Sequence, residues 1–324
     1  MNIWQKIFTL TNKGPHKLLI ILGIKIRMKR KGYKTEQLLK EIKQDVATLK
    51  ALTVYSTDIT KLKPAAGVLA SIQNINARIL AEVDRVCKEN NLTYWLSFGS
   101  LLGAVRHKGY IPWDDDIDVV MIREDYDRFI EIFKKSTTNP HYTAELYSHP
   151  EGIFNLLKVY DNRNRNSLFV DIFPCDFYYK ENMPYEEKVA LTDKLKELHS
   201  KEKRKTFNPE NGVAAHHNYY RELTKKIIFD NYQKDNTSKP MILLGGEYYH
   251  WHFESWFFNW DEIFPLSEIE FCGRKFPCPN QTNKVLHLIY RDYMAMPERL
   301  RCHSDCRKFG AEDIIKLEEI ENDK

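Results

Sequence analysis

Apolar residues recur at helical spacing in several parts of the chain. Between Pro64 and about Asn90 they follow steps of three and four residues, at Leu69, Ile72, Ile75, Ile79, Val83 and Val86. Such spacing places the side chains on one face, so it predicts a helix that buries a single stripe. A charged amphipathic helix is predicted over residues 35–51, and a third over the apolar positions of residues 126–133.

Shorter apolar runs predict strands around an aspartate-rich loop. Residues 94–97 and 117–121 are predicted as strands, and Gly99-Ser100 between them turns into a helix that continues through Val105. Three more strands are predicted at residues 143–148, 154–160 and 168–173, with a polar turn at 161–167. A hairpin turning at Gly273 and a helix from about Thr282 to Tyr293 follow near the end of the sequence. This mixture of strands and helices predicts an α+β fold.

The chain divides into segments of different character. We expect a basic amphipathic leader (1–34), an N-terminal helix (35–63), a catalytic core (64–180), a charged and mainly helical insertion (181–255), and a C-terminal hairpin and helix that pack on the core (256–324).

Basic residues are concentrated in the leader. Residues 1–35 contain nine Lys or Arg and no Asp or Glu, and since the whole chain carries +4, the remainder carries −5. The alternation from Ile24 to Lys29 favours a strand or hairpin with one cationic face. That face is interpreted either as a solvated ribbon or as a contact with an anionic membrane surface, where each basic residue contributes about 1 kcal/mol.

Composition limits the classes of function. The 324-residue chain is 43% hydrophobic and 13% aromatic, which is typical of a folded protein. No apolar run approaches the ~18 residues of a transmembrane helix, and no signal peptide is recognised. The six scattered cysteines favour a reducing cytosol, so we expect a cytoplasmic protein, peripheral on the inner face of the cytoplasmic membrane. No nucleic-acid partner is expected, because the basic residues lie mainly in the leader.

The stretch YWLSFGSLLGAVRHKGYIPWDDDID (94–118) carries the candidate chemistry. If strand pairing begins just before Ile117, Asp116 and Asp118 point to the same face, because side chains alternate along a strand. Two carboxylates placed in this way suit a hard divalent cation, Mg²⁺ or alternatively Mn²⁺. Aspartates can also cap a helix or line a polar turn. Asp114 and Asp115 are interpreted as turn residues or as supporting partners.

A further carboxylate lies in FVDIFPCDF. Asp171 lies between apolar residues of a predicted strand, where a buried charge is costly unless it is paired or bound to a metal. A neighbouring strand would bring it beside Asp116 and Asp118, as a third metal ligand or a general base. Asp176, after Pro174, is interpreted as a turn residue.

Groups for binding a phosphate precede the aspartates. Gly99 lets the backbone approach a phosphate closely, and Ser100 begins a helix whose N-terminus offers free N–H groups. Arg106, His107 and Lys108 are expected to leave that helix toward the same end of the sheet, where Arg suits phosphate contact. The alternative for these three is a solvated charged turn.

The block YWLSFGSLLGAVRHKGYIPWDDDIDVVMIREDYDRF resembles the LicD family of phosphotransferases, members of the nucleotidyltransferase-fold superfamily. The resemblance rests on the Gly99-Ser100 turn, the Asp116-Ile117-Asp118 pair and Asp171 as the third acidic residue. It resumes in FPLSEIEF and in YRDYMAMP (290–297), where Arg291 replaces the usual glycine. It covers about residues 65–176 and 262–297. The leader is similar to those of bacterial enzymes that build the outer sugars of lipopolysaccharide.

The resemblance implies a nucleotidyltransferase-type mixed β-sheet flanked by helices, with helical additions. It also implies transfer of a phosphorylated alcohol, phosphocholine above all, from CDP-choline or another CDP-alcohol. The acceptor would be a sugar hydroxyl of a cell-surface glycan or glycolipid such as lipopolysaccharide or teichoic acid. Eukaryotic relatives use CDP-ribitol. If choline is the alcohol, aromatic faces are available to its ammonium group at Tyr178, Tyr179, Trp251, Trp256 and Trp260, although such residues are more often core.

Two alternative functions remain open on the sequence. A true nucleotidyltransferase would attack the α-phosphate and release pyrophosphate instead of CMP. A zinc-stabilised binding module would use thiolates at Cys272, Cys278, Cys302 and Cys306, although their spacing is not that of a common finger.

Overall fold

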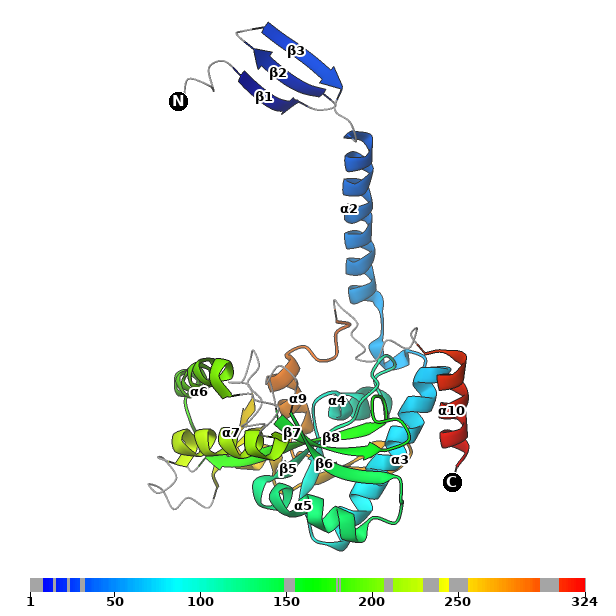
Figure 1. The fold of residues 1–324 in the computed structure, drawn as a ribbon, viewed down its shortest axis with the longest axis vertical. Helices are drawn as coiled ribbons and strands as arrows, with labels where there is room; N and C mark the ends of the chain where they lie inside the picture. The colour runs from blue at the N-terminus through cyan, green and yellow to red at the C-terminus, as the bar shows by residue number, and fades with distance from the viewer. Residues whose placement is uncertain are drawn as a thin grey trace. The chain divides into compact units, whose positions relative to one another are not determined.

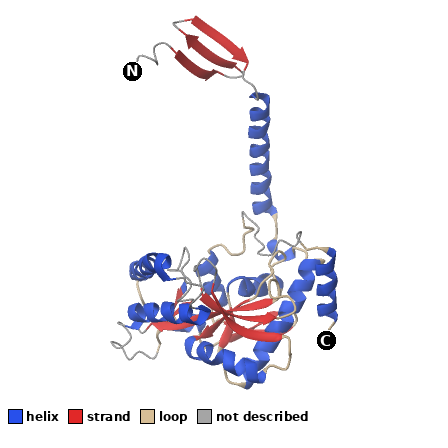
Figure 2. Cartoon of the chain, viewed as in Figure 1, coloured by secondary structure: helices blue, strands red, loops and turns tan. Residues whose placement is uncertain are grey.

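The computed structural model contains two compact units, which are described separately. One comprises Met1–Asp58 with Ala295–Glu298, and the other Ile59–Met294 with Arg299–Lys324. The structure describes residues 8–13, 16–21, 24–29, 33–148, 155–178, 180, 182–206, 212–229, 239–244, 256–297 and 309–323 (Figure 2). No helix within these ranges is both long enough and apolar enough to cross a bilayer.

The smaller unit begins with an antiparallel three-stranded sheet. Its strands are β1 (Phe8–Lys13), β2 (His16–Ile21) and β3 (Ile24–Lys29). The strand expected from the alternation at Ile24–Lys29 is therefore confirmed, and two further strands extend it into a meander. The helix α2 (Tyr33–Ser56) follows and is longer than the predicted 35–51.

The larger unit is built on a seven-stranded sheet. Its strands are β4 (Tyr94–Leu96), β5 (Asp118–Ile122), β6 (Tyr142–Ser148), β7 (Asn155–Asp161), β8 (Phe169–Tyr178), β9 (Met241–Leu244) and β10 (Phe257–Phe258). The long strand β8 pairs in parallel with β5 and antiparallel with both β7 and β9. The sheet is therefore mixed, as the sequence predicted.

Helices lie around this sheet (Figure 1). They are η1 (Ile59–Lys61), α3 (Val68–Glu89), α4 (Phe98–His107), α5 (Arg123–Ser136), α6 (Tyr185–Thr206), α7 (Gly212–Phe229), α8 (Trp260–Ile263), α9 (Thr282–Tyr290) and α10 (Ala311–Asn322). Both α3 and α5 pack against the sheet, and the predicted apolar stripe of α3 is buried from Ile72 to Val86.

The segment 181–255 corrects the sequence interpretation in one respect. Its helices α6 and α7 agree with the predicted helical insertion. However, Met241–Leu244 forms β9, a fully buried strand paired with β8 and β10. Four consecutive apolar residues suit a strand buried on both faces, but the charged residues around them obscured that pattern.

The C-terminal part contains the predicted hairpin, β11 (Ser267–Phe271) and β12 (Arg274–Cys278), which turns at Gly273 with φ 74°. After α9, the helix α10 packs on α3 through the buried Leu317 and Ile320. Arg78 on α3 donates to the backbone oxygens of Ile320 and Asp323, each at 2.8 Å. The last helix is thereby tied to the core.

The helix α9 ends at Tyr290, three residues before the predicted end, because Arg291 has φ 58° and ψ −112°. That region of backbone conformation suits glycine and strains a residue with a Cβ atom. The glycine expected at this position from the family resemblance would therefore relieve strain.

We predict that Arg291→Gly raises the free energy of unfolding by about 1 kcal/mol, because glycine removes the Cβ strain at positive φ. Thermal unfolding followed by circular dichroism measures the change. Arg291→Ala is the matched control, since it removes the long side chain but keeps the Cβ atom. A variant with alanine as stable as the glycine variant would show that the side chain, not the backbone, causes the strain.

Candidate active site

Three aspartates meet where β5 begins beside β8. The parallel register pairs Asp118, the first residue of β5, with Asp171 in β8. Asp116 lies two residues before Asp118, and one carboxylate oxygen from each of the three lies within 4.8 Å of the others. The structure thus brings together the residues that the sequence analysis proposed as metal ligands.

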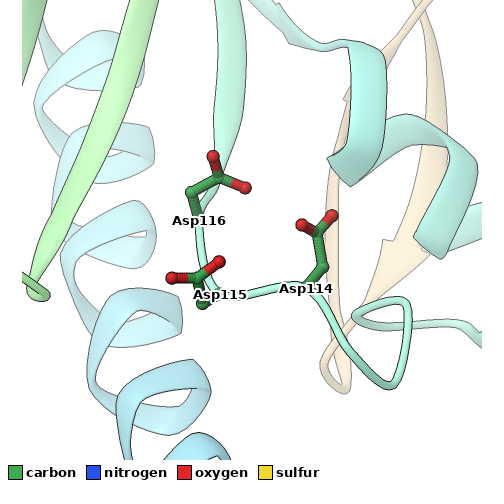
Figure 3. A group of neighbouring side chains, drawn as sticks. All are labelled: Asp114, Asp115 and Asp116. Atoms are coloured by element: carbon green, nitrogen blue, oxygen red, sulfur yellow. The ribbon is translucent and has the colours of Figure 1, made fainter. Parts of the chain in front are cut away.

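The loop before β5 adds two carboxylates. Figure 3 shows Asp114, Asp115 and Asp116 on one short loop, and one carboxylate oxygen from each lies within 4.8 Å of the other two. Asp115 is buried, with 3% of its surface exposed. Both residues, left open by the sequence, are therefore part of the acidic cluster.

Two amide side chains on α3 hold this loop in place. Gln73 Nε2 donates to the backbone oxygen of Asp114 at 2.7 Å, and Asn76 Nδ2 donates to that of Asp115 at 3.0 Å. Both amide residues are buried beside the apolar stripe. The sequence analysis missed them, although polar residues on the buried face of a helix are a detectable sign of such a role.

The N-terminus of α4 lies against the aspartates. A Cβ atom on Gly99 would lie 2.6 Å from Asp114 Oδ2 and 3.6 Å from Asp118 Oδ2, so only glycine allows this approach. Ser100 Oγ accepts a hydrogen bond from the backbone N–H of Asp118 at 2.8 Å. The serine hydroxyl therefore fixes the start of β5.

Phe98 is the first residue of α4 and has an unusual backbone conformation. It has φ 44°, unusual for a residue other than glycine, and such strain concentrates at functional sites. Its ring packs against Phe173 and Trp256, with each pair of ring centroids 5.0 Å apart. These contacts hold the first N–H groups of α4 beside the acidic cluster.

The three basic residues at the C-terminal end of α4, Arg106, His107 and Lys108, differ in their burial. Lys108 lies about 13 Å from Gly99 along the helix axis. It is exposed and pairs with Glu270 of the hairpin at 3.4 Å. The expectation that all three basic residues reach the phosphate site stays a prediction. Arg106 is buried, and burial lowers its pKa from the ordinary value; burial, followed by the charge of Arg106, also lowers the pKa of His107.

Tyr290, the last residue of α9, interacts electrostatically with both Arg106 and the aspartates. Burial of its hydroxyl, followed by the charges of Asp118, Asp114 and Asp116, raises the pKa of Tyr290 well above its usual value. The phenol therefore stays protonated and can donate a hydrogen bond. Tyr290 opens the YRDYMAMP motif, but the sequence analysis gave it no role.

Lys158 is a further residue to which the sequence analysis gave no role. It lies on β7 directly opposite Asp171. Its Nζ atom is 2.8 Å from Asp171 Oδ1 and 3.2 Å from Oδ2. A lysine within an apolar strand, beside a strand that carries a buried aspartate, is the pattern that could have identified it.

The donor set determines which ion would fit. Carboxylate oxygens are hard ligands, suited to Mg²⁺ or Mn²⁺, and the three-aspartate set offers them from two adjacent strands and the loop before one of them. Closely spaced carboxylates also repel one another unless a cation is present. The residues present therefore fit a divalent cation.

Asp176 is not a turn residue, as the sequence analysis had it. It lies within β8, and Arg123 donates to both of its carboxylate oxygens, at 2.8 and 2.7 Å. This ion pair is half-buried and joins β8 to α5. Asp176 therefore stabilises the fold, and it lies five residues along the chain from Asp171. Pro174, which suggested a turn, is accommodated inside the strand.

The cysteines do not support the proposed four-thiolate zinc site. Cys272 lies in the turn of the hairpin, and Cys278 pairs with Ser267 at its open end. The length of β12 separates them by about 13 Å or more, too far for two thiolates on one ion. Cys302 and Cys306 lie outside the described residues. The first pair therefore cannot share a zinc ion.

We predict that Gly99→Ala weakens Mn²⁺ binding about tenfold, because the new methyl group displaces the carboxylate of Asp114. Electron paramagnetic resonance of free Mn²⁺ measures the affinity. In the double variant Gly99→Ala/Asp114→Ala the clash is gone, so it should bind Mn²⁺ as well as Asp114→Ala alone. Additive losses in the double variant would contradict this explanation.

Sequence comparison shows which known proteins this chain resembles. Residues 91–209 match the family described as LicD/FKTN/FKRP, nucleotidyltransferase domain. The chain is 28% identical over 252 residues to lipopolysaccharide cholinephosphotransferase LicD of Haemophilus influenzae, an alignment that covers 69% of this chain and 91% of that protein. It is also 50% identical over 40 residues to ribitol 5-phosphate transferase FKRP of Homo sapiens and of Mus musculus, which is 12% of this chain and 8% of either relative.

The family match begins just before β4 and includes α4, the acidic loop, β5 and the central strand β8. It therefore contains every aspartate of the cluster and the glycine beside it. The similarity to the Haemophilus protein extends well beyond this region on both chains. Residues 91–209 thus match the LicD/FKTN/FKRP nucleotidyltransferase domain, and the similarity to the Haemophilus LicD protein covers 69% of this chain.

Proposed function

We propose that this protein transfers a phosphorylated alcohol from a CDP-activated donor to a sugar hydroxyl of a cell-surface glycan, with Mg²⁺ held by Asp116, Asp118 and Asp171. The observation that carries the proposal is the meeting of these three carboxylates at the N-terminus of α4. Carboxylates with a divalent cation on one side and free helix N–H groups on the other suit a diphosphate.

The chain's own residues would act mainly by positioning and by stabilising charge, as in other phosphoryl transfers. The backbone N–H groups of Gly99 and Ser100 would bind phosphate oxygens of the donor. When bound, the metal ion would neutralise charge on the diphosphate. The acceptor hydroxyl would attack the phosphorus that carries the alcohol, in line with the departing CMP.

Asp171 fits a ligand role better than that of a general base. Lys158 already contacts both of its carboxylate oxygens. A positive neighbour favours the ionised carboxylate and makes it a weaker proton acceptor. The neutral phenol of Tyr290 would donate a hydrogen bond at the edge of the same site.

The names of the relatives support the class of group that is transferred. The Haemophilus relative, matched over 91% of its length, is a cholinephosphotransferase, and the shorter match is to a ribitol 5-phosphate transferase. Both names describe transfer of a phosphorylated alcohol. Phosphocholine from CDP-choline onto lipopolysaccharide is therefore the first reaction to test.

The basic leader supports a location for the reaction. Residues 1–34 carry positive charge without any acidic residue, and β1, β2 and β3 arrange much of that segment as a sheet. Such a surface suits anionic lipid headgroups. The leader would keep the enzyme at the inner face of a membrane, where a glycolipid acceptor is accessible.

We predict that the protein releases CMP from CDP-choline in the presence of Mg²⁺ and a lipopolysaccharide-derived oligosaccharide. Asp116→Ala and Asp118→Ala should each lower kcat by a factor of about 10³ or more, because they remove the charges that hold the cation. Chromatography of the nucleotide products measures the reaction. Asp261→Ala is the control, since Asp261 pairs with Lys239 at an exposed site.

The identity of the product separates the alternatives. Release of pyrophosphate instead of CMP would contradict the proposal and favour a nucleotidyltransferase. If CDP-choline gives no CMP, then CDP-ethanolamine, CDP-glycerol and CDP-ribitol are tested with the same acceptors. CMP release that survives both aspartate substitutions would contradict the assigned metal site.

A further inference from the structure

Lys158 is a buried cation inside the acidic site. Only 8% of its surface is exposed, although lysine is rarely buried unless it is paired. Its pairing partner is Asp171, at 2.8 Å from Nζ. Because Asp171 belongs to the three-carboxylate set, the ammonium group lies at the edge of the candidate metal site.

Aromatic rings fix the position of this ammonium group. Nζ lies 3.6 Å from the centroid of the Phe169 ring and 4.7 Å from that of the Tyr147 ring. Cation–π contacts of this kind are strongest where water is excluded. Phe169 lies two residues before Asp171 on β8, so one strand supplies both an aromatic face and the carboxylate partner.

The sequence does not require a lysine at this position for packing. The strand β7 is buried throughout, and Leu157 and Val159, the neighbours of Lys158, are fully buried. An apolar residue would satisfy a buried strand at lower cost than a cation. The lysine is therefore explained better by the charges that it faces than by the core.

From this geometry we infer that Lys158 is a positioning residue that limits the negative charge of the metal site through Asp171 and thereby favours binding of the anionic donor. The inference rests on the proposed function and deepens it by assigning the chain's own cation for the diphosphate. A positive charge beside the carboxylates competes with a metal cation, but it attracts a phosphate anion. The two effects have opposite signs.

The opposite signs provide the test, with Mn²⁺ and CDP as the probes. In Lys158→Met, Mn²⁺ alone should bind about three- to tenfold more tightly, because a neighbouring positive charge is lost. CDP in the presence of saturating Mn²⁺ should bind about tenfold more weakly, because a positive charge near the bound anion is lost. Titration calorimetry of the full chain measures both dissociation constants.

Two variants control for structural effects. Lys158→Arg keeps the charge and should bind Mn²⁺ as the wild type does. Arg165→Met removes a cation that lies 4.0 Å from the Tyr160 ring and pairs with Glu145, away from the aspartates. It should leave both dissociation constants unchanged.

Each other outcome overturns the inference. Weaker binding of both probes to Lys158→Met would mean that the lysine only supports the fold. The inference also fails if Lys158→Met binds Mn²⁺ with the affinity of the wild type. It fails likewise if the two proteins bind CDP equally well, or if neither binds CDP. If the wild type fails to bind Mn²⁺, the proposed metal site itself fails, and this result is distinguished by the wild-type titration alone.

Discussion

The parallel pairing of β5 with β8 places Asp118 directly beside Asp171, and the remaining features of the site depend on that register. A shift of one residue would turn every side chain of one strand to the opposite face. Fully buried neighbours, among them Val119 and Ile172, make such a shift costly, because their apolar side chains would leave the core. The hydrophobic core therefore determines where the carboxylates meet.

The same register creates an electrostatic cost. Two ionised carboxylates whose oxygens lie within 4.8 Å repel each other by about 3 kcal/mol or more at an effective dielectric constant of about 20. The fold offsets part of this cost with Lys158, and with Gln73 and Asn76, which fix the backbone of the loop. Clustered like charges that lower stability, and that are compensated by other contacts, are typical of functional sites.

Local periodicity predicted the elements that bury one face, but it could not supply contacts between distant segments. The stripe of α3, the strands β6 to β8 and the hairpin at Gly273 were predictable because each has its own spacing or turn signal. By contrast, the pairing of β9 with β8 joins residues more than sixty positions apart. Asp176 was assigned to a turn because Pro174 precedes it, and its partner Arg123 on another element could not be inferred from local sequence.

The site residues also fall into those that local sequence identifies and those that only contacts between distant segments reveal. Asp116, Asp118 and Gly99 lie within one short stretch, where spacing and chemistry identify them. Lys158 and Tyr290 enter only through the fold, and they change what the cluster favours. The aromatic faces of Tyr147 and Phe169 already hold the ammonium group of Lys158, so these two rings are not available to a second cation. A binding site for a cationic alcohol such as choline would therefore need other aromatic or acidic side chains.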